Sequence, residues 1–318
     1  MFKAVEYTAG LFQSFLSLIK EQAHHHGAVF GGDPIKLSDE FGKVGAHTRA
    51  FFIEHDSAPT PVGLGVIHEL HTPEGRGLYL EDLYISETFR NSVRGTGSYA
   101  FGHLIQIARD EGYDYVNWMV AEDNDEHTFK FYLKKCQAVE EDLTMLSLSK
   151  KFDLASVAPQ TKYASAIDKI GPGNYRLSLK DASGAEIAGA YMNENYSTFR
   201  TISGLRIEPY LPESDKISAN DNISDVYDAL HRRVIEFARD SGNTGHIVWA
   251  VPKDDAKLES FLTAQGLQTY RLDENVPETR LIPFRIGRSD IDSDLMDRLQ
   301  NNPSPSAQQQ NAGLNTGP

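Results

Sequence analysis

Apolar and polar positions in the first half of the chain follow short periods that predict a mixed α/β domain. Residues 1–7 are expected to form a strand, and residues 11–23 carry apolar side chains at helical spacing. Residues 49–54 and 62–70 flank a turn-rich DSAPTP segment, so they are predicted to pair as a hairpin. Further along, the pattern predicts a strand over residues 78–86, a loop over 90–97, a helix over 98–111, a strand over 115–120 and a helix over 126–135.

The second half of the chain repeats landmarks of the first at a spacing of about 130 residues. The run ARDEG that ends at Gly112 returns as ARDSG ending at Gly242, and GLYLE at residues 77–81 returns as GLRIE at 204–208. Trp118 and Trp249, the two tryptophans of the sequence, keep a similar spacing, and FY at residues 131–132 falls on FL at 261–262. These ordered matches predict a duplicated domain, with copies at residues 1–148 and 160–287.

Composition and charge narrow the possible partners. The chain has 31 basic and 45 acidic side chains and a net charge of −14, which repels nucleic acids and anionic membranes and favours a cationic substrate. No apolar run is long enough to cross a membrane, and the N-terminus lacks a basic leader. With a single cysteine, Cys136, and no internal disulfide, we expect a cytoplasmic protein. Residues 300–318, without aromatic or charged side chains, are predicted to be a disordered tail.

A glycine-containing loop between a strand and a helix marks a candidate anion site. Backbone N–H groups at a helix N-terminus can bind a phosphate, and Gly95 and Gly97 would let one approach. Arg90 and Arg94 add counter-charge, although glycine pairs at this place are more often plain turns. The loop is neither a P-loop nor a dinucleotide fingerprint, because the Gly-Lys-Ser/Thr and G-x-x-G continuations are absent.

Four segments in order resemble the Gcn5-related N-acetyltransferase (GNAT) superfamily, and within it the diamine (spermidine/spermine) N-acetyltransferase-like branch. They are LYLEDLYI at residues 78–85, the Arg/Gly loop at 90–97, VAE at 120–122 with Asn124, and FYLKK at 131–135. The resemblance covers nearly all of residues 1–150. It implies tandem GNAT folds, each a mixed, splayed β-sheet flanked by helices, with the pantetheine arm of acetyl-CoA between the fourth and fifth strands.

The same resemblance implies which residues bind acetyl-CoA. The backbone of Leu83 and Ile85 would hold the pantetheine arm, and the loop ending at Gly97 would hold the pyrophosphate. Ser92 stands where similar proteins have Arg or Gln, so the choice between Arg90 and Arg94 stays open. Cys136 stands where the family usually has glycine. The complete set is Leu83, Tyr84, Ile85, Arg90, Arg94, Gly95, Thr96, Gly97, Ser98, Asn124 and Lys134.

Two residues match the family's proton-transfer groups. Glu81, flanked by apolar residues, would accept the proton of the attacking amine; the alternative is a strand-end carboxylate paired with an arginine. Tyr132 would donate a proton to the departing thiolate; alone it would more often be a core residue. A backbone N–H around Leu83 would meet the oxyanion. Asp82 and Glu122 would attract a cationic acceptor, unless the acidic residues near 122 form only a solvated loop.

Histidine pairs and triplets in the sequence do not predict a metal site. Three consecutive histidines at residues 24–26 cannot all face one ion. His68 and His71 fall one residue short of a zincin spacing and lie on a predicted strand. We therefore expect no metal.

The second copy keeps the fold signals but not the binding signals. Residues 209–222 contain neither Gly-x-Gly nor arginine, and Asp215, Asp221 and Asp225 would repel a pyrophosphate. Leu262 replaces the tyrosine. The sequence thus predicts an N-acetyltransferase acting on a primary amine of a small cationic acceptor, as a monomer with pseudo-dimeric halves or a homodimer. Alternatives are a protein lysine acetyltransferase and a non-catalytic acyl-CoA-binding or interaction module.

Overall fold

A computed structural model describes residues 1–25, 29–42, 47–122, 124, 126–148, 154–159, 161–197, 202–211, 222–242, 247–270, 281–292, 295 and 298–299. The tail predicted at 300–318 lies outside these ranges, as do His26, Asp215 and Asp221. No helix of the described part is long and apolar enough to cross a membrane.

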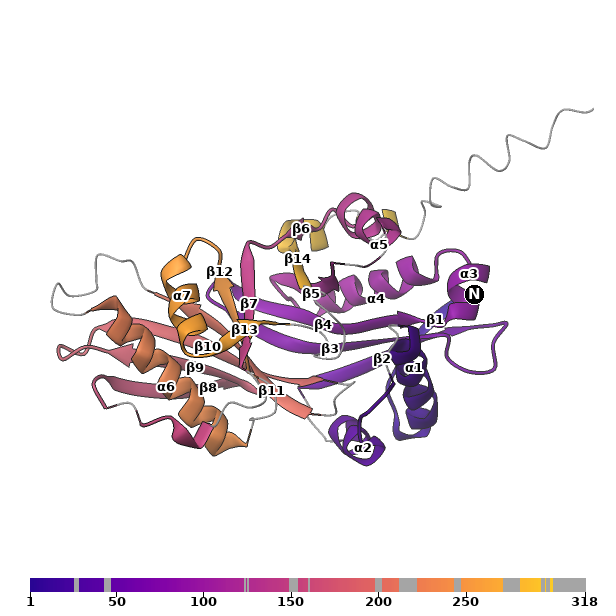
Figure 1. Cartoon of the computed structure of the whole chain (residues 1–318). Coiled ribbons are helices and arrows are strands. Elements are labelled where there is room, and N and C mark those ends of the chain that lie inside the picture. Colours follow the sequence, from indigo (N-terminus) through magenta and orange to yellow (C-terminus); the bar gives the residue numbers. More distant parts are fainter. Residues whose placement is uncertain are drawn as a thin grey trace, which may run out of the picture.

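The first sheet has the strand order β1-β2-β3-β4-β5-β14-β6. Helix α4 packs on one face of this sheet, and α1 and α2 pack on the other (Figure 1). The elements are β1 (Phe2–Glu6), η1 (Ala9–Leu11), α1 (Phe12–His25), α2 (Pro34–Gly42), β2 (Thr48–His55), β3 (Gly63–Thr72), β4 (Gly75–Ile85), α3 (Glu87–Ser92), α4 (Thr96–Asp110), β5 (Tyr115–Ala121), α5 (Glu126–Lys130), the π-helical turn η2 (Phe131–Lys135), β6 (Val139–Glu140), β14 (Leu281–Gly287) and α8 (Arg288–Ile291).

The second sheet has the order β13-β7-β12-β11-β10-β9-β8. Its core is built largely with the apolar stripe of α6, together with residues of α7. The elements are β7 (Leu143–Leu148), η3 (Leu154–Ser156), β8 (Ala164–Gly171), β9 (Asn174–Lys180), β10 (Glu186–Ser197), β11 (Ile202–Tyr210), α6 (Ile223–Ser241), β12 (Ile247–Pro252), α7 (Ala256–Ala264) and β13 (Leu267–Thr269).

The two halves exchange one strand each. β7, from the end of the first half, lies between β12 and β13 of the second sheet, and β14 lies between β5 and β6 of the first. Both sheets therefore have the same order of equivalent strands, but neither is built from one continuous segment. The predicted limits 1–148 and 160–287 do not describe the sheets, because residues 143–148 and 281–287 each cross to the other half. Periodicity marks strands but does not show which sheet a strand joins.

The sequence repeat has a structural counterpart. Trp118 of β5 pairs with Leu80 of β4, and Trp249 of β12 pairs with Ile207 of β11, in parallel ladders at matched places. Gly112 and Gly242, with φ of 73° and 78°, follow α4 and α6 and donate their N–H groups to Arg109 and Arg239. Glycine is favoured there because the left-handed conformation closes a helix without a Cβ clash. The predicted mixed α/β architecture with helix-flanked sheets is confirmed.

Short helices were missed or misplaced by the pattern. α2, with nine residues, was not predicted, and α3 occupies the start of the predicted 90–97 loop. The helix predicted over residues 126–135 is α5 followed by the π-helical turn η2. That change of pitch alters which side chains face the first half's core.

Candidate active site

β4 and β5 separate part of the way along their length. They pair from Gly77 with Tyr115 to Leu80 with Trp118, and beyond this point both strands continue without pairing to each other. The register between β3 and β4 skips Glu81, since Ile67 faces Leu80 and Val66 faces Asp82. A β-bulge of this kind bends a strand and redirects its side chains. Glu81 therefore lies at the point where the two strands diverge.

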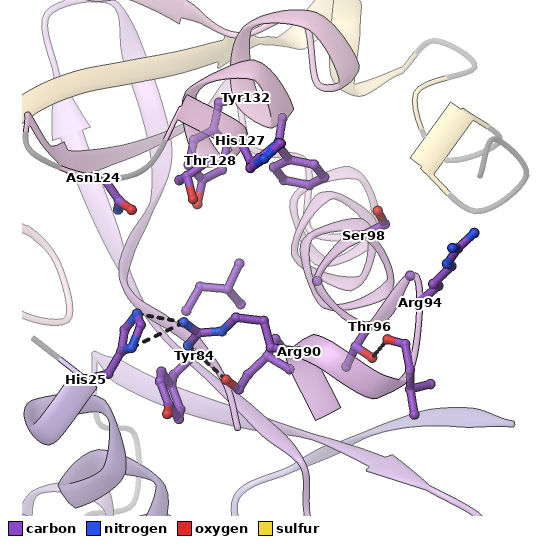
Figure 2. Close-up of a pocket in the computed structure, with 16 residues that line it drawn as sticks. His25, Tyr84, Arg90, Arg94, Thr96, Ser98, Asn124, His127, Thr128 and Tyr132 are labelled. Carbon is purple, nitrogen blue, oxygen red and sulfur yellow. Dashed lines mark hydrogen bonds between the residues drawn. The ribbon is translucent and has the colours of Figure 1, made fainter. Parts of the chain in front are cut away.

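A cavity of about 420 Å³ lies beside this opening, against α4 and η2. Figure 2 shows Tyr132, His127 and Thr128 on one side of it and His25, Tyr84 and Arg90 on the opposite side. Most of the residues predicted to bind acetyl-CoA line this cavity: Leu83, Tyr84, Ile85, Arg90, Arg94, Gly95, Thr96, Gly97, Ser98 and Asn124.

The N-terminus of α4 faces this cavity without a side-chain cap. Gly95 is the N-cap residue and has a φ of 87°. The first N–H groups of a helix have no acceptor within the helix, and the helix dipole makes this end positive. A Cβ built on Gly97 would meet no described atom within 4 Å, so the backbone borders open space. These features suit a negatively charged group.

The two candidate arginines lie in different surroundings. Arg90 Nη2 donates to the Ile85 carbonyl at 3.0 Å, and Arg90 Nη1 lies 2.6 Å from His25 Nε2. The Arg90 guanidinium also stacks over Tyr84, at 5.1 Å from the ring centroid. Arg94 is exposed, and its side chain leads away from Arg90 (Figure 2). Arg90 thus contacts the end of β4, whereas Arg94 stands immediately before the N-terminus of α4.

Lys135, and not the predicted Lys134, reaches the N-terminus of α4. Lys135 Nζ donates to Ser98 Oγ at 2.8 Å, whereas Lys134 is exposed and lines neither cavity described here. The π-helical turn explains the difference, because Cys136 N bonds to Phe131 O with one residue more than an α-helical turn contains. The sequence predicted a regular helix over residues 131–135, so it could not show that Lys135 rather than Lys134 contacts Ser98.

A second cavity of about 120 Å³ is lined mainly by residues of β4 and β5 around the strand opening. Asp82, only 6% exposed, accepts a hydrogen bond from Gln22 of α1, at 2.9 Å between Oδ1 and Nε2. The lining consists of Gln22, Leu80, Glu81, Asp82, Leu83, Trp118, Met119, Val120, Ala121, Asn124, Tyr132 and Leu281. Leu83, Asn124 and Tyr132 line both cavities, so the two meet there.

Aromatic side chains surround Tyr132 at this junction. Its ring centroid lies 5.0 Å from that of Trp118, 5.6 Å from Phe101 and 6.1 Å from Phe284. Burial raises the pKa of the Tyr132 hydroxyl above its ordinary value, so this group keeps its proton at neutral pH. The hydroxyl is available as a proton donor.

Other predicted residues lie away from the cavities. Glu122 is exposed and lines neither of them. His24 is exposed, and within the described residues no group of three or more His, Cys, Asp or Glu side chains could hold a metal ion. Gln22, Met119 and Leu281 were not predicted as site residues, because ordinary core and strand residues carry no sequence signal of a cavity.

The corresponding places in the second half look different. The N-cap of α6 is Asn222, whose side chain accepts a hydrogen bond from Ser224 N at 3.1 Å, and Asp225 follows in the first turn. Leu262 is fully buried where the repeat has Tyr132 in the first half. Glu208, at the position matching Glu81, pairs with Arg206 at 2.6 Å. The described part of the second half thus fills these places with internal contacts.

Comparisons with known proteins agree with this geometry. Residues 17–137 match the acetyltransferase (GNAT) family. A tandem GNAT protein from the clavulanic acid biosynthesis pathway, solved without acetyl-CoA, is 13% identical with a TM-score of 0.51, covering 90% of this chain and 98% of that one. A GCN5-related N-acetyltransferase from Sphaerobacter thermophilus is 8% identical with a TM-score of 0.51, covering 90% and 95%.

A third similar structure has a different domain context. It is a GCN5-related glucosamine N-acetyltransferase region of a fungal multi-domain β-N-acetylglucosaminidase, 10% identical with a TM-score of 0.51, covering 89% of this chain and 38% of that one. A search of curated proteins found no match. At these identities the structures establish the fold, and the family match covers all the lining residues of the two cavities except Leu281. The chain therefore has a tandem GNAT fold, and its residues 17–137 match the acetyltransferase (GNAT) family.

Proposed function

We propose that the first half transfers the acetyl group of acetyl-CoA to a primary amine of a small, cationic acceptor. The observation that carries this proposal is the meeting of the two cavities at Leu83, Asn124 and Tyr132, with Glu81 displaced by a bulge into the smaller one. Donor and acceptor can then occupy separate cavities that meet at the opening between β4 and β5. The resemblance to the diamine acetyltransferase branch points to the same class of acceptor.

The larger cavity fits the donor. The first-turn N–H groups of α4 at Thr96, Gly97 and Ser98 would bind the pyrophosphate, with Arg94 and Lys135 as counter-charges. The unpaired edge of β4 from Leu83 to Ile85 would hold the pantetheine arm like an added strand. When bound, acetyl-CoA supplies an activated acetyl thioester. The Ile85 carbonyl already accepts from Arg90, but a carbonyl oxygen has a second lone pair for the arm.

The residues at the junction supply the proton transfers. An amine has a pKa near about 10, so it must lose a proton before it attacks. Glu81 accepts that proton, the free amine then forms the C–N bond, and a backbone N–H of β4 near Leu83 stabilises the oxyanion. Tyr132, which keeps its proton at neutral pH, donates it to the sulfur as the C–S bond breaks, and the second proton of the acetylated nitrogen restores the Tyr132 hydroxyl. Asp82 attracts the positive charge of the acceptor.

The size of the smaller cavity limits what it can hold. Sites for whole ligands usually measure about 300–1,000 Å³, whereas this one measures about 120 Å³. The cavity would therefore hold the amine-bearing end of an acceptor. Because the two halves already pair through exchanged strands, we expect a monomer, and the single, buried Cys136 fits a cytoplasmic location.

A thiol-release assay tests the function. The purified chain with acetyl-CoA is given spermidine, putrescine, glucosamine or a lysine-containing peptide, and calorimetry measures acetyl-CoA binding separately. We expect release with the small polyamines and little with the peptide. Turnover of the peptide alone would indicate a protein lysine acetyltransferase. Acetyl-CoA binding without acetyl transfer to any amine would indicate a non-catalytic binding module.

A further inference from the structure

We propose that Leu281 sets the size of the acceptor that the first half acetylates. Leu281 lies on β14, the strand that the second half of the sequence contributes to the first sheet. This inference rests on the proposed function, since it concerns the acceptor side of the same site. It gives the second half a part in substrate selection.

Leu281 lies at the open end of β5. It pairs with Ala121, the last residue of β5, at a level where β4 no longer pairs with β5. β14 lies on the side of β5 away from β4, and Leu281 reaches the cavity at the level of the last residue of β5. Leu281 lines the smaller cavity together with Glu81 and Asp82, and it is the residue of that lining that comes from the second half of the sequence.

Alternate side chains of β14 lie on opposite faces of the strand and have different surroundings. Ile282, Phe284 and Ile286 pack into the core beneath α4. Since successive side chains of a strand point to opposite faces, Leu281 shares the other face with Arg285, which stacks over Tyr115 at 3.8 Å. Leu281 thus lies on the face opposite that core and lines the acceptor cavity, whereas its neighbour Ile282 packs into the core.

The cavity has a polar wall and an apolar wall. Gln22, Glu81 and Asp82, from α1 and β4, provide the polar groups. Met119, Ala121 and Leu281, from β5 and β14, provide apolar surface, and Met119 also packs against Met145, Val248 and Ala250 of the second sheet. Residues of the second sheet therefore pack against the apolar wall at Met119. An acceptor held by its ammonium group at the polar wall would lay its aliphatic arm against Leu281.

This arrangement defines the acceptor class as a primary amine on a short aliphatic arm. A larger side chain at position 281 would shorten the space for that arm, and a smaller one would lengthen it. Binding differences of one methylene in an apolar pocket change specificity by about tenfold or more. Acetyl-CoA binding would be unaffected, because Leu281 does not line the larger cavity.

The test uses the full chain and a ladder of linear diamines from 1,3-diaminopropane to 1,6-diaminohexane, with acetyl-CoA as donor. The readout is kcat/KM for each amine, and calorimetry measures the Kd of acetyl-CoA. Leu281→Phe should lower the long-to-short ratio of kcat/KM at least about tenfold, and Leu281→Ala should raise it. The Kd of acetyl-CoA should stay at the wild-type value in both variants.

Ile282→Ala is the matched control, since it shortens the adjacent apolar residue on the core face. It should lower the melting temperature while leaving the amine preference unchanged. Folded Leu281 variants with the wild-type amine profile would overturn the inference alone. If the wild-type chain acetylated no amine of the ladder, the proposed function would fail, and this inference with it.

Discussion

Tyr79 and Arg206 occupy matched positions in the two copies, and they contact each other, with the guanidinium 4.9 Å from the ring centroid. Residues related by a twofold axis contact each other when the axis passes between them. The pseudo-twofold axis therefore passes near this pair. Arg206 also donates to Glu208 Oε1 at 2.6 Å and to Asn117 Oδ1 at 3.1 Å, so it links β11 to β5 of the first sheet. Arg206 thus joins the halves, and Glu208, at the position that matches Glu81, is the ion-pair partner of this arginine.

Arg206→Met should destabilise the chain by about 3–5 kcal/mol, because it leaves the buried Glu208 carboxylate without its cation. Urea unfolding measures the change. The double variant Arg206→Met/Glu208→Leu is expected to recover most of the loss, since it removes both charges. Equal destabilisation in the single and double variants would show that shape, rather than charge pairing, dominates at this site.

Glu141 should make stability depend on pH. Burial raises the pKa of Glu141 from 4.5 to about 7, so between these values the folded chain keeps a proton that the unfolded chain has released. The free energy of unfolding should therefore fall as pH rises through this range, by about 3 kcal/mol relative to Glu141→Gln. Above pH 7 the difference should be constant. Parallel pH profiles of the two proteins would contradict this.

Glu81→Gln should lower kcat for amine acetylation by about 10²- to 10⁴-fold, because the amide cannot accept the amine's proton. The Kd of acetyl-CoA should change little, since Glu81 lines only the smaller cavity. Glu122→Gln is the control, because Glu122 is exposed and lines neither cavity. An unchanged rate in Glu81→Gln would assign the proton to water or to another carboxylate.

Tyr132→Phe should slow thiol release while leaving the fold intact, because it removes one hydroxyl and keeps the ring between Trp118 and Phe101. Stopped-flow detection of free thiol, with circular dichroism as the check on folding, measures this. Tyr99→Phe changes a tyrosine that lines neither cavity and should not affect the rate. A wild-type rate in Tyr132→Phe would make Tyr132 a packing residue.

Sequence patterns predicted the parts of the fold that depend on local spacing. The hairpin of β2 and β3, the helices α1 and α4 and the repeat at Gly112 and Gly242 follow from periodicity and turn chemistry. The bulge at Glu81 could not be predicted, because one extra residue in a strand leaves the apolar pattern almost unchanged. The strand exchange of β7 and β14 depends on which sheet a strand joins, which side-chain alternation does not specify.

The candidate site was predictable where a motif carried it. The resemblance singled out the loop around Gly95 and Gly97 and the residues Glu81 and Tyr132, and these residues line the two cavities. Lys135 was missed because a π-helical turn rotates it into the place expected for Lys134. Leu281 was missed because it comes from the far end of the chain and looks like any strand residue.

The central claim is that the two copies divide their tasks and that only the first binds the donor. Isothermal titration calorimetry with acetyl-CoA tests it most directly, on the wild-type chain and on Gly97→Val. The added side chain has room in the fold, since its Cβ meets no described atom within 4 Å, but it would occupy the space of the pyrophosphate. The account predicts one acetyl-CoA per chain, with binding weakened or lost in Gly97→Val. Two equivalent sites per chain, or unchanged affinity in folded Gly97→Val, would contradict it.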